Sequence, residues 1–173
     1  MIQRSLALAL AVLVSPLVAA LALLVRLDGG PALFRQTRLG AGREPFTIHK
    51  LRTMRDGTVT PLGRVLRRTG LDELPQLIDI ARGRMRFIGP RPLTEADVVR
   101  LEWDGPERDL RWGVPPGLTG YAQFAPVCDR ALSWSLDEFY VRHRSAALDL
   151  KITAASCAAL VLGKQRAKGW FWG

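Results

Sequence analysis

Cysteine and histidine are scarce in this chain of 173 residues, which contains two of each. Neither Cys128 and Cys157 nor His49 and His143 have a second thiol or imidazole at the spacing of a zinc ligand pair. This scarcity argues against a disulfide scaffold and a structural zinc site, and it fits a reducing compartment. There is also no internal repeat and no low-complexity tract, and the length allows one domain with a real core.

Acidic residues are also few, since 16 Asp and Glu face 25 Lys and Arg and leave a formal net charge of +9. An excess of this size suits an anionic partner such as nucleic acid, anionic lipid or a phosphorylated substrate. Most of the basic residues are arginines. The planar guanidinium group matches phosphate oxygens better than a lysine ammonium does.

Polar residues are nearly absent from Leu6 to Val25, where only Ser15 and Pro16 are not apolar. By its length this stretch is a candidate transmembrane helix. Three interpretations compete: a spanning helix kinked at Pro16, a signal peptide cleaved near 18–20, and a re-entrant hairpin that enters and leaves by one face of the membrane. The strongly basic chain after Arg26 favours a cytoplasmic body and weighs against export.

The central position of Ser15-Pro16 bears on the re-entrant interpretation. Proline removes a helix hydrogen bond and clashes with the preceding turn, and a serine hydroxyl can bond the freed backbone. Each half of the stretch is about ten residues or roughly 15 Å of helix, which is half of a ~30 Å hydrocarbon core. A sharp bend would return the chain to its starting side, and Arg4 and Arg26 at the two ends fit the cytoplasmic face.

After the apolar stretch, two short strands are predicted at 33–38 and 45–51, with Gly40-Ala41-Gly42 between them in a hairpin. The basic residues of this region are Arg35, Arg38, Arg43, Lys50, Arg52 and Arg55. They form either an ordinary solvated face or a surface for phosphate or lipid headgroups, and the local sequence does not decide between the two.

The acid pair Asp72-Glu73 follows the basic pair Arg67-Arg68 and precedes an apolar run at helical spacing. The run predicts a helix over roughly 72–82, with Pro75 in the first turn, where proline is tolerated. An Asp cap with a Glu in the first turn would be an ordinary structural feature there. The alternative is an active site, because carboxylates between two clusters of arginine suit phosphate chemistry.

Arg91 lies between two prolines, which restrict its backbone. It is either a structural corner or a phosphate ligand held in position. Residues 94–112 predict an interrupted surface helix, residues 115–123 a second ordered loop, and a further helix begins near Ser135.

The end of the chain combines an apolar segment at 152–162, too short to span a membrane, with basic residues and tryptophans. The basic and aromatic residues are Lys164, Arg166, Lys168, Trp170, Phe171 and Trp172. This composition suits the membrane interface, and a disordered tail is the alternative.

A set of segments in fixed order extends over nearly the whole chain. The segments are Ser15-Pro16, Gly30-Pro31, Phe34-Arg35-Gln36, Pro45 to Met54, Leu71 to Leu77, Ile88 to Leu93, Pro116 to Gln123 and Leu148 to Ile152. Together they resemble the bacterial sugar transferases, the monotopic phosphoglycosyl transferases that start glycan assembly on a polyprenol carrier. The resemblance is specific because no single short motif carries it, and it is to the small type that consists of the catalytic domain alone.

The resemblance implies a reaction at a membrane. A nucleotide-diphosphate sugar, UDP-linked in many relatives, would give its sugar-1-phosphate to polyprenol (undecaprenyl) phosphate and release UMP. The family is thought to form a covalent phosphosugar–aspartate intermediate with the help of Mg²⁺. The product would enter assembly of an exopolysaccharide, O-antigen or glycoprotein glycan.

Carried over to this sequence, the resemblance makes Asp72 the nucleophile and a magnesium ligand. Glu73 is the second member of the pair, and its role as base or metal partner stays open. The implied phosphate ligands are Lys50, Arg52, Arg67 and Arg91. A helix N-terminus would add backbone N–H donors for an anion and would keep Asp72 ionised, as a nucleophile requires.

The implied fold is α+β, mainly helical with a small β-hairpin, in a monotopic protein of the bacterial inner membrane. Residues 1–28 would form a re-entrant helix–break–helix at Ser15-Pro16, and residues 29–173 a cytoplasmic catalytic domain with interfacial helices. The expected partners are the nucleotide sugar, polyprenol phosphate and the bilayer, without nucleic acid, and a homo-oligomer stays open. The rival is a membrane-anchored basic module that binds anionic lipid or nucleic acid without catalysis.

Overall fold

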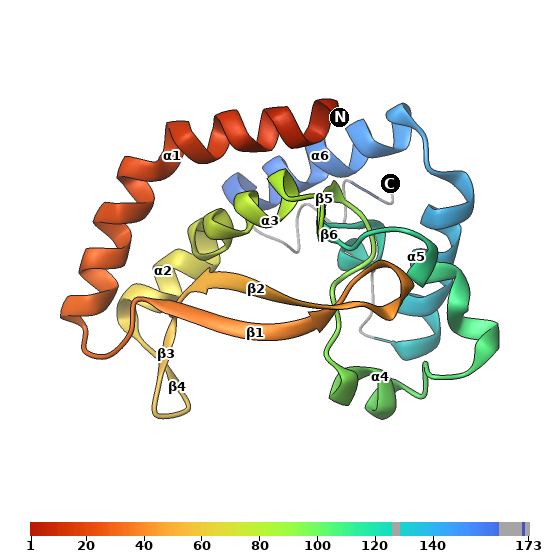
Figure 1. Cartoon of the computed structure of the whole chain (residues 1–173), viewed down its shortest axis with the longest axis horizontal. Helices are drawn as coiled ribbons and strands as arrows, with labels where there is room; N and C mark the ends of the chain where they lie inside the picture. The colour runs from red at the N-terminus through yellow and green to blue at the C-terminus, as the bar shows by residue number, and fades with distance from the viewer. Residues whose placement is uncertain (126–128, 163–170, 172–173) are drawn as a thin grey trace. The chain divides into compact units, whose positions relative to one another are not determined.

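The computed structural model describes residues 1–125, 129–162 and 171, and these residues are mainly helical with three two-stranded sheets (Figure 1). The chain divides into two compact units, residues 1–37 with 47–83 and residues 38–46 with 84–173. The predicted α+β class with mainly helical content is confirmed. Its sheet content exceeds the single hairpin that we expected, because two further strand pairs form.

The first unit begins with a long helix and continues through a hairpin into short helical segments. Its elements are α1 (Ile2–Leu27), most of β1 (Leu33–Leu39) and β2 (Pro45–Leu51), β3 (Met54–Arg55), β4 (Thr58–Val59), α2 (Pro61–Thr69), the 3₁₀ helix η2 (Leu71–Gln76) and α3 (Leu77–Ala81). β1 pairs with β2, which confirms the predicted strands, and β3 pairs antiparallel with β4. Val25, Leu51 and Leu66 form one buried cluster, so α1, β2 and α2 share a core.

Helix α1 is continuous from Ile2 to Leu27 with Pro16 inside it, and its ribbon bends along its length (Figure 1). The Ser15 hydroxyl donates to the Val12 carbonyl, a local bond that accompanies helix bending. The expected helix–break–helix therefore does not appear as an interruption of the helix. Among the described residues, α1 is the one helix that is long and apolar enough to cross a membrane.

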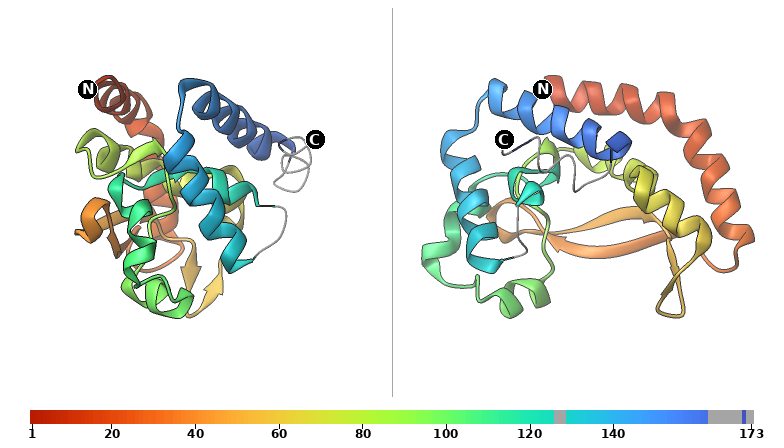
Figure 2. Two further views of the ribbon diagram at one scale, coloured as in Figure 1. Left: turned by 90° about the vertical axis from the view of Figure 1, so that its right-hand side faces the viewer. Right: turned by 180° about the vertical axis from the view of Figure 1, so that it is seen from behind.

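The second unit contains the tip of the hairpin and the C-terminal half of the chain. Its elements are η1 (Ala41–Arg43), β5 (Arg86–Ile88), α4 (Glu95–Leu101), η3 (Pro106–Gly113), β6 (Gly117–Thr119), η4 (Tyr121–Phe124), α5 (Arg130–His143) and α6 (Ala146–Leu162). β5 and β6 pair in parallel, with Arg86 opposite Gly117 and Ile88 opposite Thr119. α5 and α6 are successive helices joined by a short turn (Figure 2).

Glycines of the two ordered turns bring the backbones of β5 and β6 together. A Cβ atom on Gly117 would lie 2.1 Å from the Gly89 nitrogen, and one on Gly120 would lie 2.1 Å from the Gly89 oxygen. Because real Cβ atoms do not approach so closely, these positions require glycine. Hydrogen bonds from Gly89 N to Thr119 O and from Gly117 N to Pro90 O close the junction.

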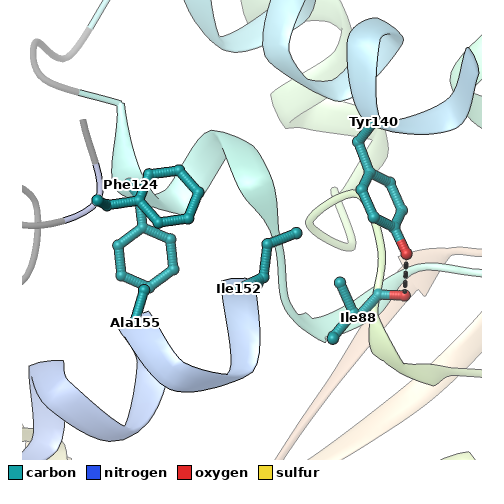
Figure 3. Packing of buried hydrophobic residues seen from close by; sticks show 6 residues of the cluster. Ile88, Phe124, Tyr140, Ile152 and Ala155 are labelled. Atoms are coloured by element: carbon teal, nitrogen blue, oxygen red, sulfur yellow. Dashed lines mark hydrogen bonds between the residues drawn. The ribbon is translucent and has the colours of Figure 1, made fainter. Parts of the chain in front are cut away.

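The core of the second unit lies against this strand pair. Ile88, Phe124, Tyr140, Ile152 and Ala155 are buried together (Figure 3). The Tyr140 hydroxyl donates to the Ile88 carbonyl at 3.2 Å and to the Asp149 carboxylate at 2.8 Å. Burial and the bond to Asp149 raise the pKa of Tyr140, so its hydroxyl stays protonated and links α5 to β5 and α6.

Some predicted boundaries in the second unit were wrong. The helix expected from Ser135 begins at Arg130, because Asp129 caps it by accepting the Leu132 N–H. The interrupted helix predicted at 94–112 is α4, started by a reciprocal cap between Thr94 and Asp97, followed by the 3₁₀ helix η3. The predicted basic, tryptophan-rich tail lies outside the described residues except for Phe171, which is buried.

Candidate active site

The acid pair Asp72-Glu73 lies in the first turn of η2, immediately after Gly70 ends α2 in the left-handed conformation at φ 70°. The α-helix predicted from residue 72 begins instead at Leu77, because the residues around Pro75 adopt 3₁₀ geometry. Gly70 occupies the N-cap position of η2. Asp72 is therefore not the helix cap, although Glu73 lies in the first turn as the structural alternative expected.

Asp72 is buried, with only 8% of its surface exposed. Burial raises the pKa of its carboxyl group, and the negative charge of Glu73 raises it further, while Lys50, a backbone hydrogen bond and Arg67 act in the opposite direction. The backbone hydrogen bond at the helix start lowers the pKa of Asp72, as expected, but burial and Glu73 raise it by more. Loss of solvent outweighs the local donors, so Asp72 depends on nearby cations to hold its charge.

Lys50 on β2 reaches the acid pair directly. Its Nζ atom donates to Glu73 Oε1 at 2.5 Å, and both side chains are partly exposed. A charge-assisted bond between these groups holds the Glu73 carboxylate in one place beside Asp72. The structure thus brings together three of the predicted site residues, Lys50, Asp72 and Glu73, from two segments of the first unit.

Arg67 is held at the end of α2 by Thr53, which lies between β2 and β3. Its Nε atom donates to the hydroxyl of buried Thr53 at 2.8 Å. α2 can approach Thr53 closely because residue 63 is glycine, where a Cβ atom would lie 2.1 Å from the Thr53 oxygen. Within the described residues, no acceptor is found for the two terminal nitrogens of Arg67, which leaves them available to an anion.

Arg52 does not fit the predicted role of a phosphate ligand. Its guanidinium donates to four backbone oxygens, those of Val25, Gly29, Pro31 and Met54. The Val25 carbonyl lies in the last turn of α1, where a positive charge is favourable, and Gly29 follows the C-cap residue Asp28. Arg52, two residues after Lys50, thus joins the end of the apolar helix α1 to the end of β2.

We expect Arg52→Ala to lower the stability of the first unit, because four carbonyl oxygens lose their charged donor. A loss of about 2 kcal/mol is the expected scale for such bonds. In thermal unfolding of the detergent-solubilised protein this corresponds to a midpoint roughly 4–8 °C lower. Arg35→Ala, at an exposed position of β1, is the control. A midpoint for Arg52→Ala that matches the control would contradict the anchoring role.

Arg91 belongs to the second unit. Its side chain is exposed, while its backbone carbonyl accepts a hydrogen bond from Arg111 at 2.9 Å. The prolines on both sides and this bond fix the Arg91 backbone. The predicted rigid corner and the predicted exposed cation are therefore features of the same residue.

Metal ligands are sparse around the acid pair. In residues 1–125, 129–162 and 171, no group of three or more His, Cys, Asp and Glu side chains gathers at one point. Mg²⁺ is often held by one or two carboxylates together with substrate phosphates and water. Asp72, a carboxylate in a largely buried setting, fits such a site, and a site of this kind needs no larger cluster.

The sequence did not predict two contacts of buried carboxylates with basic side chains. His49 Nδ1 lies 3.7 Å from the fully buried Asp79 carboxylate, and Arg111 donates to the buried Asp137 carboxylate at 3.0 Å. For Asp79 there was a signal, since a charged residue within the apolar run of α3 requires a partner. The two residues of the Arg111–Asp137 pair are 26 positions apart, and no local pattern connects them.

The sequence of this chain is similar to those of known proteins. A family model described as bacterial sugar transferase matches residues 1–163. A UDP-glucose:undecaprenyl-phosphate glucose-1-phosphate transferase of Caulobacter vibrioides is 44% identical over 129 residues, 66% of this chain and 48% of that protein. A UDP-N-acetylgalactosamine-undecaprenyl-phosphate N-acetylgalactosaminephosphotransferase of Aeromonas hydrophila is 34% identical over 171 residues, 87% of this chain and 40% of that protein.

A relative of more similar length is the exopolysaccharide production protein PSS of Rhizobium leguminosarum bv. phaseoli, 34% identical over 165 residues, 80% of this chain and 82% of that protein. The chain spans about half or less of the length of the Caulobacter and Aeromonas relatives. The family match, in contrast, extends over the acid pair, the Arg91 turn and most of both units. The chain therefore belongs to the bacterial sugar transferase family.

Proposed function

We propose that this protein transfers a sugar-1-phosphate from a UDP-sugar to undecaprenyl phosphate and releases UMP, the first membrane step of glycan assembly. The observation that carries the proposal is the buried Asp72 beside the Lys50–Glu73 pair. The names of the Caulobacter and Aeromonas relatives, which both specify a UDP-sugar and undecaprenyl phosphate, support it. The Rhizobium relative is named for exopolysaccharide production.

The first step forms a covalent intermediate on Asp72. A carboxylate oxygen of Asp72 attacks the phosphorus that carries the sugar, and the bond from that phosphorus to the bridging oxygen breaks. UMP leaves with the electron pair. Asp72 must be deprotonated for this attack, and Lys50 and Arg67 supply positive charge that favours its ionised form and neutralises the diphosphate.

The second step returns Asp72 to its starting state. A phosphate oxygen of undecaprenyl phosphate attacks the same phosphorus, and the bond to Asp72 breaks. Glu73, which accepts a hydrogen bond from Lys50, would act as a base or as a second metal partner. Asp72 and the substrate phosphates would hold Mg²⁺, which when bound supplies further charge neutralisation.

The membrane arrangement that fits this reaction is re-entrant. Helix α1 exposes large apolar side chains along its length, among them Leu8, Val12, Leu13 and Leu23. Its internal Pro16 and its basic ends at Arg4 and Arg26 support a hairpin with both ends on the cytoplasmic face of the inner membrane. An undecaprenyl chain could then stay in the bilayer while its phosphate is presented at the interface.

The function is tested by incubating the purified protein in nanodiscs with undecaprenyl phosphate, Mg²⁺ and a panel of UDP-sugars. We expect UMP release with at least one sugar and dependence on the lipid acceptor for continued turnover. A basic binding module would instead show salt-sensitive binding of anionic lipid or nucleic acid without UMP release. That result across the whole panel would contradict the proposed reaction.

Topology gives a separate prediction. In a background of Cys128→Ser and Cys157→Ser, Ile2→Cys should react with a membrane-impermeant maleimide only after the cells are permeabilised. Arg35→Cys in the cytoplasmic body serves as the control. Labelling of the first variant in intact cells would establish a spanning helix and overturn the re-entrant arrangement.

A further inference from the structure

Thr53 is a buried polar residue of the first unit to which the reaction scheme assigns no role. It lies between β2 and β3, and only 7% of its surface is exposed. A buried hydroxyl usually has a hydrogen-bond partner, because an unpaired polar group away from water is costly. Both the backbone and the side chain of Thr53 bond to α2 or to the residue that caps this helix.

The backbone carbonyl of Thr53 fixes the start of α2. It accepts a hydrogen bond from the N–H of Thr60 at 3.1 Å, and Thr60 caps α2 by accepting the Gly63 N–H. At Gly63 the helix passes so close that a side chain on this residue would overlap the Thr53 carbonyl. The first turn of α2 is therefore held against the Thr53 backbone.

The Thr53 hydroxyl fixes the other end of the same helix. It accepts a hydrogen bond from Arg67 Nε at 2.8 Å. Because the guanidinium group is planar and rigid, a bond to Nε sets the direction in which the two terminal nitrogens point. With Nε engaged, the Nη1–Nη2 edge remains for an anion, and this edge can donate two parallel hydrogen bonds to the oxygens of one phosphate.

The direction of Arg67 matters because the acid pair is close to it. Gly70 ends α2 and begins η2, so only a tight turn separates Arg67 from Asp72. Burial and Glu73 raise the pKa of Asp72, and Arg67 is one of the two cations that oppose this effect. A phosphate bound to Arg67 therefore lies beside the Asp72 carboxylate. Misplacement of a reacting group by about 1 Å can lower a rate about 100-fold.

We propose that Thr53 is a positioning residue for the transfer reaction. Its hydroxyl holds Arg67 so that the Nη1–Nη2 edge receives a phosphate of the donor beside Asp72. The inference rests on the proposed function, since it takes this phosphate to belong to the diphosphate of a UDP-sugar. The bond between Thr53 and Arg67 is measurable without turnover, so the positioning role and the reaction can fail separately.

The first test measures UMP release in nanodiscs with undecaprenyl phosphate and the UDP-sugar that the wild type uses. Thr53→Val keeps the shape of the side chain but removes the acceptor, and it should lower kcat/KM for the UDP-sugar about tenfold or more. Thr53→Ser keeps the hydroxyl and should stay within about threefold of the wild type. The matched control is Thr69→Val, which removes an exposed hydroxyl from the same helix and should also stay within about threefold.

A double-variant cycle distinguishes positioning of Arg67 from general support of the fold. Arg67→Lys keeps the positive charge but lacks the Nε–H donor and the planar group, so it should lower kcat/KM to a similar extent. In the Arg67→Lys background, Thr53→Val should change kcat/KM by less than about twofold, because the bond that it removes no longer exists. If the two losses multiply in full, Thr53 acts independently of Arg67 and the proposal is overturned.

Hydrogen exchange of the Arg67 Nε–H with water tests the bond without any substrate. The measurement is made by NMR on detergent-solubilised protein with isotope-labelled arginine, and the Arg67 signal is identified by its loss in Arg67→Lys. In the wild type this exchange should be about tenfold or more slower than that of exposed Arg64. Thr53→Val should remove the protection and Thr53→Ser should retain it. The wild-type comparison remains decisive should Thr53→Val fail to fold.

The outcomes keep the positioning role apart from the reaction. If the wild type turns over a UDP-sugar and Thr53→Val does so equally well, the positioning role is overturned and the reaction stands. If the wild type turns over no UDP-sugar, the proposed reaction falls. Slow exchange at Arg67 that depends on the Thr53 hydroxyl would then still support the hold on Arg67, and exchange as fast as that of Arg64 would overturn it.

Discussion

Asp72→Asn is expected to abolish release of UMP from the UDP-sugar that the wild type uses, with a fall in rate of about 1,000-fold or more. Asparagine has nearly the same shape as aspartate, but its amide cannot form the phosphosugar intermediate. Asp72 is buried next to Lys50 and Glu73, and asparagine fills the same space. Removal of the charge should therefore leave the fold intact and affect the chemistry alone. UMP release is measured in nanodiscs with undecaprenyl phosphate.

Two controls sharpen this result. Asp56→Asn removes a carboxylate from an exposed turn of the same unit and should retain full activity. Intact-mass measurement after incubation with the UDP-sugar alone should show one added sugar phosphate on the wild type and none on Asp72→Asn. Full activity of Asp72→Asn would refute the nucleophile assignment. A sugar phosphate on another residue would move the assignment there.

Arg111→Met is expected to give the largest loss of stability. Asp137 is buried, and Arg111 is its charged partner through two hydrogen bonds. Breaking a buried pair by removing one partner costs about 3–5 kcal/mol, because a charge is left without compensation. The thermal midpoint should fall by roughly 6–20 °C. Arg142→Met, which removes an exposed pair with Glu138 on the same helix, should shift it little.

The destabilisation by Arg111→Met should depend on pH. Burial raises the pKa of Asp137, and Arg111 opposes this effect. Without Arg111 the folded-state pKa rises further above the unfolded value, so the folded state holds a proton that the unfolded state releases. The free energy of unfolding of the variant should therefore fall as pH rises above the ordinary carboxyl range. The double variant Arg111→Met/Asp137→Leu should recover part of the loss at neutral pH, and a double variant as unstable as the single one would contradict this explanation.

Local patterns predicted most of the elements. The strands at 33–38 and 45–51, the helical run after the acid pair and the rigid Arg91 turn all appear in the structure. Predicted helix boundaries were wrong where a local hydrogen bond or a proline determines where the helix begins. Asp129 starts α5 five residues before the predicted position, and Pro75 favours a 3₁₀ segment where an α-helix was predicted.

The candidate site was predictable in its residues and not in its electrostatics. The acid pair Asp72-Glu73 stood out by its place between two clusters of arginine, and the resemblance to the family implied the roles of Lys50, Arg67 and Arg91. Whether a basic side chain binds a phosphate or donates to backbone carbonyls depends on the groups that lie beside it in three dimensions. Arg52 lies in the same basic stretch as Lys50. Arg52 donates to a carbonyl at the end of α1, whereas Lys50 donates to the Glu73 carboxylate.

The sequence by itself determined the apolar N-terminal helix and the acid pair, because these depend on composition and on residues close together in the chain. The order of its segments carried the resemblance to the family. Only the tertiary structure decided that Asp72 is buried with a raised pKa, that Arg52 donates to backbone carbonyls, and that Arg111 joins Asp137 to the Arg91 backbone. Burial and hydrogen-bond partners come from segments distant in sequence. A local pattern can name a charged side chain, but only packing determines which opposite charge or carbonyl it reaches.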